Sequence, residues 1–151
     1  MSPTLFFDVL AALHDAVAAA LPDVPVRLGP PTDDEPTMLG VFIGWDLTAD
    51  SGRAGNFGQS YHELGAGAAR DDSGQIVGYA VAQSGDADYL TLCSRVSDVL
   101  DAIQDVVRAD PTLGMPGRVY RTELAGGELF LSNEGMYAAE LVFRLSYYAL
   151  T

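Results

Sequence analysis

Several residue types that often carry function are scarce or missing in this sequence. Its one cysteine, Cys93, cannot form an internal disulfide, and no cysteine and histidine spacing typical of zinc sites occurs. All 8 basic residues are arginine, so the lysine of a P-loop is absent. No run approaches the roughly 18 apolar residues of a membrane span, and no basic segment typical of a signal peptide opens the chain. We therefore expect a soluble, unexported protein with no membrane association.

Net charge and chain length further restrict the classes of function and the number of domains. The formal net charge is −13, with 21 acidic residues, and such a surface repels phosphate backbones. This argues against ordinary nucleic-acid binding. A chain of 151 residues with 48% hydrophobic residues is long enough for a real core but short for two, so we expect one domain over residues 1–151.

The clearest predicted element is a long amphipathic helix within Gly85–Gly114. Asp86 or Asp88 can cap its start, and Pro111 ends it after Ala109. Polar residues fill the positions between apolar ones, as expected for a helix with one buried side. The apolar residues at helical spacing are Leu92, Val96, Val99, Leu100, Ile103, Val106 and Val107. In a chain of this size, the partner for that side is a β-sheet.

Before this helix, the pattern predicts one further helix and four strands. A leading helix ends at Leu21, because Pro22 stops it. Val24–Leu28 is a short edge strand, and the apolar run Met38–Trp45 is a strand buried on both faces. Two more strands, 57–64 and 75–84, are joined by a loop and form a hairpin.

After the central helix, the sequence pattern predicts strands and their connections but no further helix. Arg118–Leu124 is one strand, residues 125–127 form a turn, and Glu128–Asn133 is a short exposed arm. Met136–Ala149 is the longest strand, because its apolar residues alternate over the whole segment. The predicted fold class is α+β: a mixed or antiparallel sheet packed against the long amphipathic helix and the N-terminal helix.

No catalytic residue, cofactor site or metal site is predicted. His62 beside Glu63 is a possible general base in a small acidic enzyme or ligand-binding α+β domain, but neighbours in a strand point to opposite faces. The acidic clusters at 33–35 and 71–72 lack the ligand spacing of an EF-hand. The glycine-rich stretch 65–70 lacks the third glycine of a dinucleotide fingerprint and opens no helix.

Apolar and aromatic residues in predicted loops and edges indicate a protein interface instead. A monomer has little reason to keep Phe130 and Leu131 on an exposed arm flanked by glycine, so we expect an oligomer. The predicted interface residues are Trp45, Phe57, Tyr61, Met115, Leu129, Phe130 and Leu131.

Taken together, these features resemble the tail terminator proteins of long-tailed phages, the lambda-type family found also in actinobacterial phages and prophages. The likeness covers most of the chain and rests chiefly on the order of elements and the ending of the central helix. It is carried by the helix ending in Leu21-Pro22, the strand closing as Val41-Phe42-Ile43-Gly44-Trp45-Asp46, the strand from Ile76 into Ser84-Gly85-Asp86, the helix ending Val107-Arg108-Ala109-Asp110-Pro111-Thr112-Leu113-Gly114, and the final strand Ala139–Ala149.

The resemblance implies a virion structural protein without enzymatic activity. Such a subunit forms a six-fold ring on the head-proximal end of the tail tube, assembled in the host cytoplasm. Its partners are further copies of itself, the tail tube protein and the head-tail connector or stopper protein, and DNA passes through the lumen without specific binding. An acidic chain is consistent with that passage.

Three other interpretations stay open at this point. The first alternative is that the chain is a different phage virion protein, namely a head-tail joining, tail completion or tail tube protein. The second alternative is the small acidic enzyme or ligand-binding domain that uses His62 and Glu63. The third is an intracellular interaction module with no role in a virus.

Overall fold

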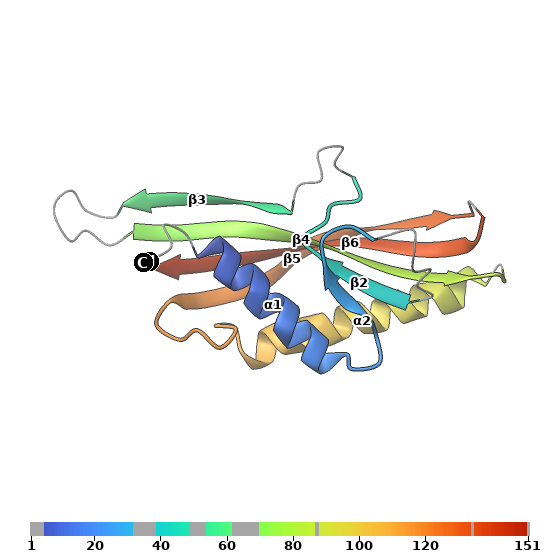
Figure 1. Cartoon of the computed structure of the whole chain (residues 1–151), viewed down its shortest axis with the longest axis horizontal. Coiled ribbons are helices and arrows are strands. Elements are labelled where there is room, and N and C mark those ends of the chain that lie inside the picture. Colours follow the sequence, from blue (N-terminus) through green and yellow to red (C-terminus); the bar gives the residue numbers. More distant parts are fainter. Residues whose placement is uncertain are drawn as a thin grey trace.

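The computed structural model describes residues 5–31, 39–48, 54–61, 70–86, 88–133 and 135–150. These residues form two helices and six strands. In chain order they are α1 (Phe6–Ala20), β1 (Val26–Leu28), β2 (Leu39–Ile43), β3 (Gly55–Tyr61), β4 (Arg70–Ser84), α2 (Tyr89–Ala109), β5 (Val119–Ser132) and β6 (Tyr137–Leu150). The arrangement is α+β, as predicted (Figure 1).

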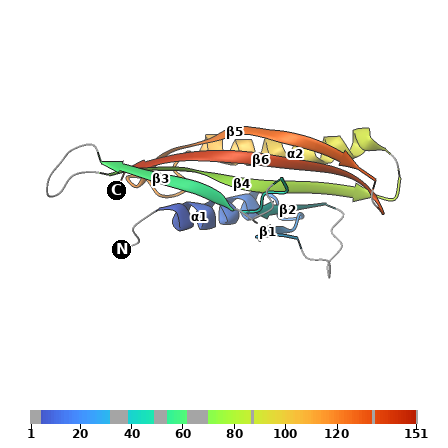
Figure 2. The ribbon, with the colours of Figure 1, turned by 90° about the horizontal axis from the view of Figure 1, so that it is seen from above.

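One mixed sheet organises the fold, in the order β1-β2-β4-β6-β5. Strand β4 pairs with β6 over almost its whole length, and its other side is shared by β3, opposite residues 70–76, and β2, opposite residues 78–82. Among the strands that the structure describes, only β1 and β2 pair in parallel. Figure 2 shows β5 at one border of the sheet and β1 and β2 at the other.

Helix α2 forms where the pattern predicts it. Asp88 caps its start by accepting hydrogen bonds from the Thr91 backbone N–H, at 3.2 Å, and from the Thr91 hydroxyl, at 2.7 Å. These bonds, the hydroxyl first, hold the pKa of Asp88 below its usual range. The helix ends at Ala109, directly before Asp110 and Pro111. Its buried residues are Leu92, Val96, Val99, Ile103 and Val107.

Both helices share one core with one face of the sheet. The alternation of β6 places Leu141, Phe143 and Leu145 on this face, where they pack with buried residues of α1 and α2. The ring of Phe143 lies against Gly78 of β4, and a Cβ at position 78 would collide with that ring. The absence of a side chain at Gly78 is therefore what allows the close packing.

The structure differs from the sequence prediction along β5 and β4. Residues 125–127 are not a turn: β5 continues through them with a register shift between Leu124 and Gly126, and Gly126 adopts a φ of 155°. The predicted arm at 128–133 is therefore mostly the second half of an edge strand. Strand β4 begins at Arg70, earlier than predicted, because β3 and β6 both pair with it there. Asp72 is thereby fully buried.

Candidate assembly surface

The border of the sheet formed by β5 is the main unpartnered feature of the described residues. Of its 14 residues, all but Tyr120 and Ala125 have partners in β6 on one side, and no strand of the described part of the chain pairs with the other side. Residues 119–132 contain neither proline nor lysine, and the features that protect such an edge are limited here to the bulged positions and to Arg121, Glu123 and Glu128. A long edge of this kind offers its outer backbone groups to another strand.

The second half of β5 also exposes large apolar side chains. The exposed fractions are 50% for Leu129, 37% for Phe130 and 52% for Leu131. Their partners in β6 are Leu141, Glu140 and Ala139, respectively. Leu129 and Leu131 consequently lie on the face that carries the helices, and Phe130 lies on the opposite face, so both sides of the edge present apolar surface.

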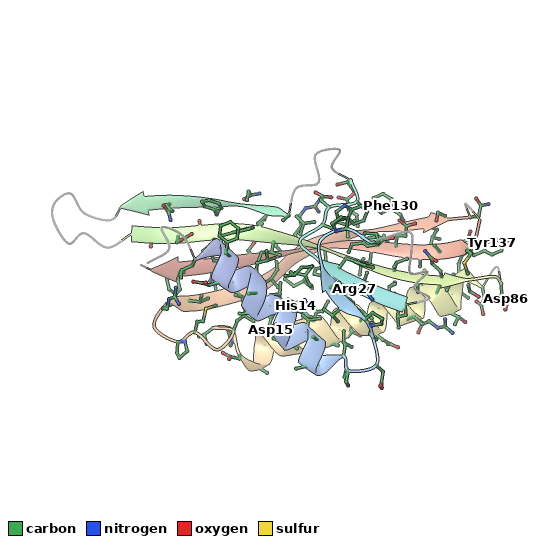
Figure 3. All side chains as sticks on the ribbon, viewed as in Figure 1. His14, Asp15, Arg27, Asp86, Phe130 and Tyr137 are labelled. Carbon is green, nitrogen blue, oxygen red and sulfur yellow. The ribbon has the colours of Figure 1, made fainter. Side chains whose placement is uncertain are left out.

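Hydrogen bonds from both faces hold the end of this edge in place. The Tyr89 hydroxyl, from the first turn of α2, donates to the Ser132 carbonyl oxygen at 3.1 Å. The Ser132 hydroxyl donates to Glu140 Oε1, also at 3.1 Å. The Tyr89 ring packs edge-on against Tyr137, which lies at the same end of the molecule as Asp86 (Figure 3). We call Tyr89, Ser132 and Glu140 the strand clamp.

A buried tyrosine lies next to the clamp. Burial raises the pKa of Tyr79 well above its ordinary value, and the nearby Glu140 carboxylate raises it further. A hydrogen bond between the side chains of Tyr79 and Glu140 also raises this pKa. Its ring is in edge contact with the Trp45 indole, with ring centroids 4.9 Å apart.

The other predicted interface residues lie apart from this edge. Trp45 is half-buried in the cluster around Tyr79, and Met115 is half-buried against the main core. Phe57 is 50% exposed on β3, where its ring lies 5.4 Å from that of Phe6. Tyr61 pairs through its backbone with Arg70 at the end of β3, and its side chain is not among those described. The structure thus gathers only Leu129, Phe130 and Leu131 into one surface.

Sequence reasoning did not single out several other exposed apolar residues. Leu90 is 86% exposed in the first turn of α2, and Phe7 is 64% exposed in the first turn of α1. Neither residue belongs to the set of positions that forms the buried side of its helix. This position outside the apolar stripe is the sequence signal that could have identified them as exposed. Leu28 and Tyr120 are also exposed, in β1 and β5.

The described residues gather no group suited to metal chemistry. Among them, no cluster of three or more His, Cys, Asp or Glu side chains is close enough to hold an ion. Asp72 instead accepts hydrogen bonds from the Leu5 backbone N–H, at 2.9 Å, and the Tyr147 hydroxyl, at 3.2 Å. His62, Glu63 and the cluster at 33–35 lie outside the described residues. No helix in the described part of the chain is long and apolar enough to cross a membrane.

Comparison with known proteins supplies a fold relationship. No protein-family model matches the chain, and no curated protein matches it in sequence. One similar solved structure is described as "Virion of native gene transfer agent (GTA) particle". A chain of that particle matches with a TM-score of 0.61 at 12% sequence identity, over 98% of this chain and 100% of that chain. The two chains share a fold along their whole length.

Proposed function

We propose that this chain is a structural protein of a phage-like virion and, within it, a tail terminator. The observation that carries the proposal is the fold match, which spans nearly all of this chain and all of a chain from a virion particle. The match covers 98% of this chain, so it is not a likeness of one short motif. The order of elements that resembles the tail terminator family supports the narrower role.

The two borders of the sheet are suited to head-to-tail contact between copies of the chain, which the proposed ring requires. One border is the continuous 14-residue strand β5, and the other is built from the shorter strands β3 and β1. Because the borders differ, contact between them joins unlike surfaces of two copies, and such contacts generate rings when the rotation closes. The second half of β5, with Leu129, Phe130 and Leu131, is our candidate for one side of the contact, and Phe57 and Tyr61 on β3 are candidates for the other.

A ring of this kind ends tail growth through its geometry. A ring built from head-to-tail contacts has two different faces, so one face can match the last ring of the tail tube while the other does not accept a further tube subunit. The second face is then available to the head-tail connector. The proposed partners are therefore copies of this chain, the tail tube protein and the connector protein. No catalytic step is required.

The charge of the chain is compatible with DNA passing through such a ring. At a net charge of −13, the subunit repels the phosphate backbone, which disfavours adhesion of DNA to the wall of the channel. Other acidic proteins share this property, so it supports the proposal without carrying it.

The test is the mass of the purified protein, measured by light scattering, with negative-stain imaging of the same fractions. We expect closed rings of about six 16.0 kDa subunits, formed by the protein alone or on the ends of purified tail tubes. Filaments would instead identify a tube subunit. A monomer that also leaves tube ends bare would refute the terminator role and favour the ligand-binding alternative.

A further inference from the structure

The register of the sheet relates positions on its two outer borders. Through the paired strands, Glu128 of β5 shares one row with Val142, Tyr79 and Phe42, and the row ends at Arg27 of β1. Arg27 and Glu128 are therefore level with each other, one on each border of the same sheet. They also carry opposite charges. A neighbouring copy that continued the sheet in the same rows would place its Arg27 beside Glu128.

Both charged side chains lie on the face of the sheet opposite the helices. The residues between them in the row belong to the apolar cluster on that face, and side chains in one row point to the same face. Arg27 is exposed, and the Glu128 side chain is 53% exposed although it accepts a hydrogen bond from Arg144 at 3.3 Å. Because a carboxylate has several acceptor sites, Glu128 can bind a second guanidinium without losing the first.

The rows on either side of this pair are apolar and lie on the face that carries the helices. Val26 of β1 is level with Leu129 of β5, and Leu28 of β1 is level with Gly127 of β5. Leu28 is 51% exposed and Leu129 is 50% exposed. Since Gly127 has no side chain, Leu28 of a neighbour has room to pack diagonally against Leu129. The two borders therefore match in apolar surface as well as in charge.

The strand directions allow this contact without inverting a copy. Strand β1 is parallel to β2, whereas the next three pairs, β2 with β4, β4 with β6 and β6 with β5, are antiparallel. Strand β1 consequently runs opposite to β5, so a copy placed alongside joins these borders as an antiparallel pair. His14 Nε2 lies 3.1 Å from the Val26 carbonyl oxygen, which fixes β1 to α1 and leaves that oxygen a second lone pair for a neighbouring strand.

We infer that β1 of one copy lies beside the second half of β5 of the next copy, with Arg27 against Glu128. This contact rests on the head-to-tail assembly proposed above and names the residues that fix its register. A slip of one residue would turn Leu28 to the wrong face. A slip of two would place Arg27 beside Phe130 or Gly126 instead of a carboxylate. The register read from the rows satisfies both the charges and the apolar side chains.

The partner on each border is a second copy of this chain, because both complementary surfaces belong to it. In the same alignment, Thr122 in the first half of β5 is level with Phe57 of β3. Strand β3 of one copy then lies beside the first half of β5 of the next. The exposed Phe57 ring is thereby brought to the same contact, at its other end.

Sedimentation velocity of two charge-reversal variants, alone and mixed, tests the inference on the intact protein. We expect Arg27→Glu and Glu128→Arg each to raise the concentration needed for assembly at least about tenfold, because each brings like charges together across the contact. An equimolar mixture of the two should assemble within about threefold of the unmodified chain. When the variants alternate around a ring with an even number of copies, every contact again joins opposite charges.

Two control variants separate this pair from general charge effects. Glu123→Arg changes a carboxylate on the same face of the first half of β5, and its mixture with Arg27→Glu should not regain assembly. Arg95→Glu makes the same charge change on the exposed side of α2 and should alter assembly by less than about twofold. Thermal unfolding verifies that each variant is folded. If Glu128→Arg is unstable beside Arg144, neutral glutamine variants at positions 27 and 128 replace the reversals, and the double variant should assemble no worse than either single one.

The outcomes distinguish this contact from the function on which it rests. If the unmodified chain formed no rings, alone or on tube ends, the proposed function would fail and the contact with it. If rings formed normally with Arg27→Glu, or if the mixture did not regain assembly, only the contact would be overturned. Normal rings of Arg27→Glu that no longer bound tube ends would assign this border to the tail tube protein instead.

Discussion

Replacing Leu131 by aspartate should block assembly while leaving the subunit folded. Leu131 is 52% exposed in the isolated subunit, so its side chain contributes only part of its surface to the core. Covering the exposed part, roughly 90 Å², contributes about 2 kcal/mol to each contact between subunits. An aspartate forfeits this contribution and adds about 3–5 kcal/mol for an unpaired charge in a closed contact. The combined loss of about 5–7 kcal/mol weakens each contact by more than about a thousandfold.

Sedimentation velocity at several protein concentrations measures this effect, and thermal unfolding measures the stability of the subunit. We expect the variant to remain monomeric at concentrations where the unmodified chain forms rings, with an unfolding midpoint shifted by no more than a few degrees. Leu90→Asp is the matched control, because Leu90 is 86% exposed on α2 and the charge change is identical.

Three results would contradict the reasoning. If Leu131→Asp assembled like the unmodified chain, the second half of β5 would lie outside the interface. If Leu90→Asp blocked assembly and Leu131→Asp did not, the contact would be formed by the start of α2 instead. Unfolding of the Leu131→Asp subunit would show that Leu131 contributes more to the core than its exposure indicates.

Three other substitutions test the fold and the strand clamp. Val99→Asp should unfold the subunit, seen as lost circular dichroism or insolubility, because Val99 is 2% exposed and an unpaired buried charge costs much of a typical 5–15 kcal/mol stability. Gly78→Ala should cost about 1–3 kcal/mol in denaturant unfolding, because its methyl group collides with Phe143. Tyr89→Phe removes one hydrogen bond, worth about 0.5–1.5 kcal/mol, and should speed amide hydrogen exchange in residues 128–132, whereas Tyr137→Phe should not.

The elements that sequence alone predicted well are those whose signals are local. The stripe and the Asp88 cap of α2 lie within one continuous segment, and so does the alternation of β6. The hairpin of β3 and β4 joins neighbours in the chain. In each case, the residues that determine the structure are close in sequence, and pattern reasoning uses this information directly.

The errors arose where a distant partner decides the conformation. Gly126 and Gly127 are suitable for a turn, and they form a bulged strand only because β6 runs beside them. Asp72 belongs to a short acidic run, yet it is buried because β3 and β6 pair on either side of it, and the backbone N–H of Leu5, 67 positions away, donates to it. Such contacts between distant residues cannot be predicted from the pattern within a single segment.

The strand clamp links the rigidity of the subunit to its proposed assembly. An edge strand that is disordered before contact must lose backbone entropy when it pairs, at roughly 1–2 kcal/mol per residue. Tyr89 and Glu140 hold Ser132 from opposite faces of the sheet, so the strand that carries Leu129, Phe130 and Leu131 is already extended in the isolated subunit. Pairing with another copy then requires little further ordering. The exposed apolar side chains and the clamp therefore act together, because the first provide attraction and the second reduces the entropic cost of contact.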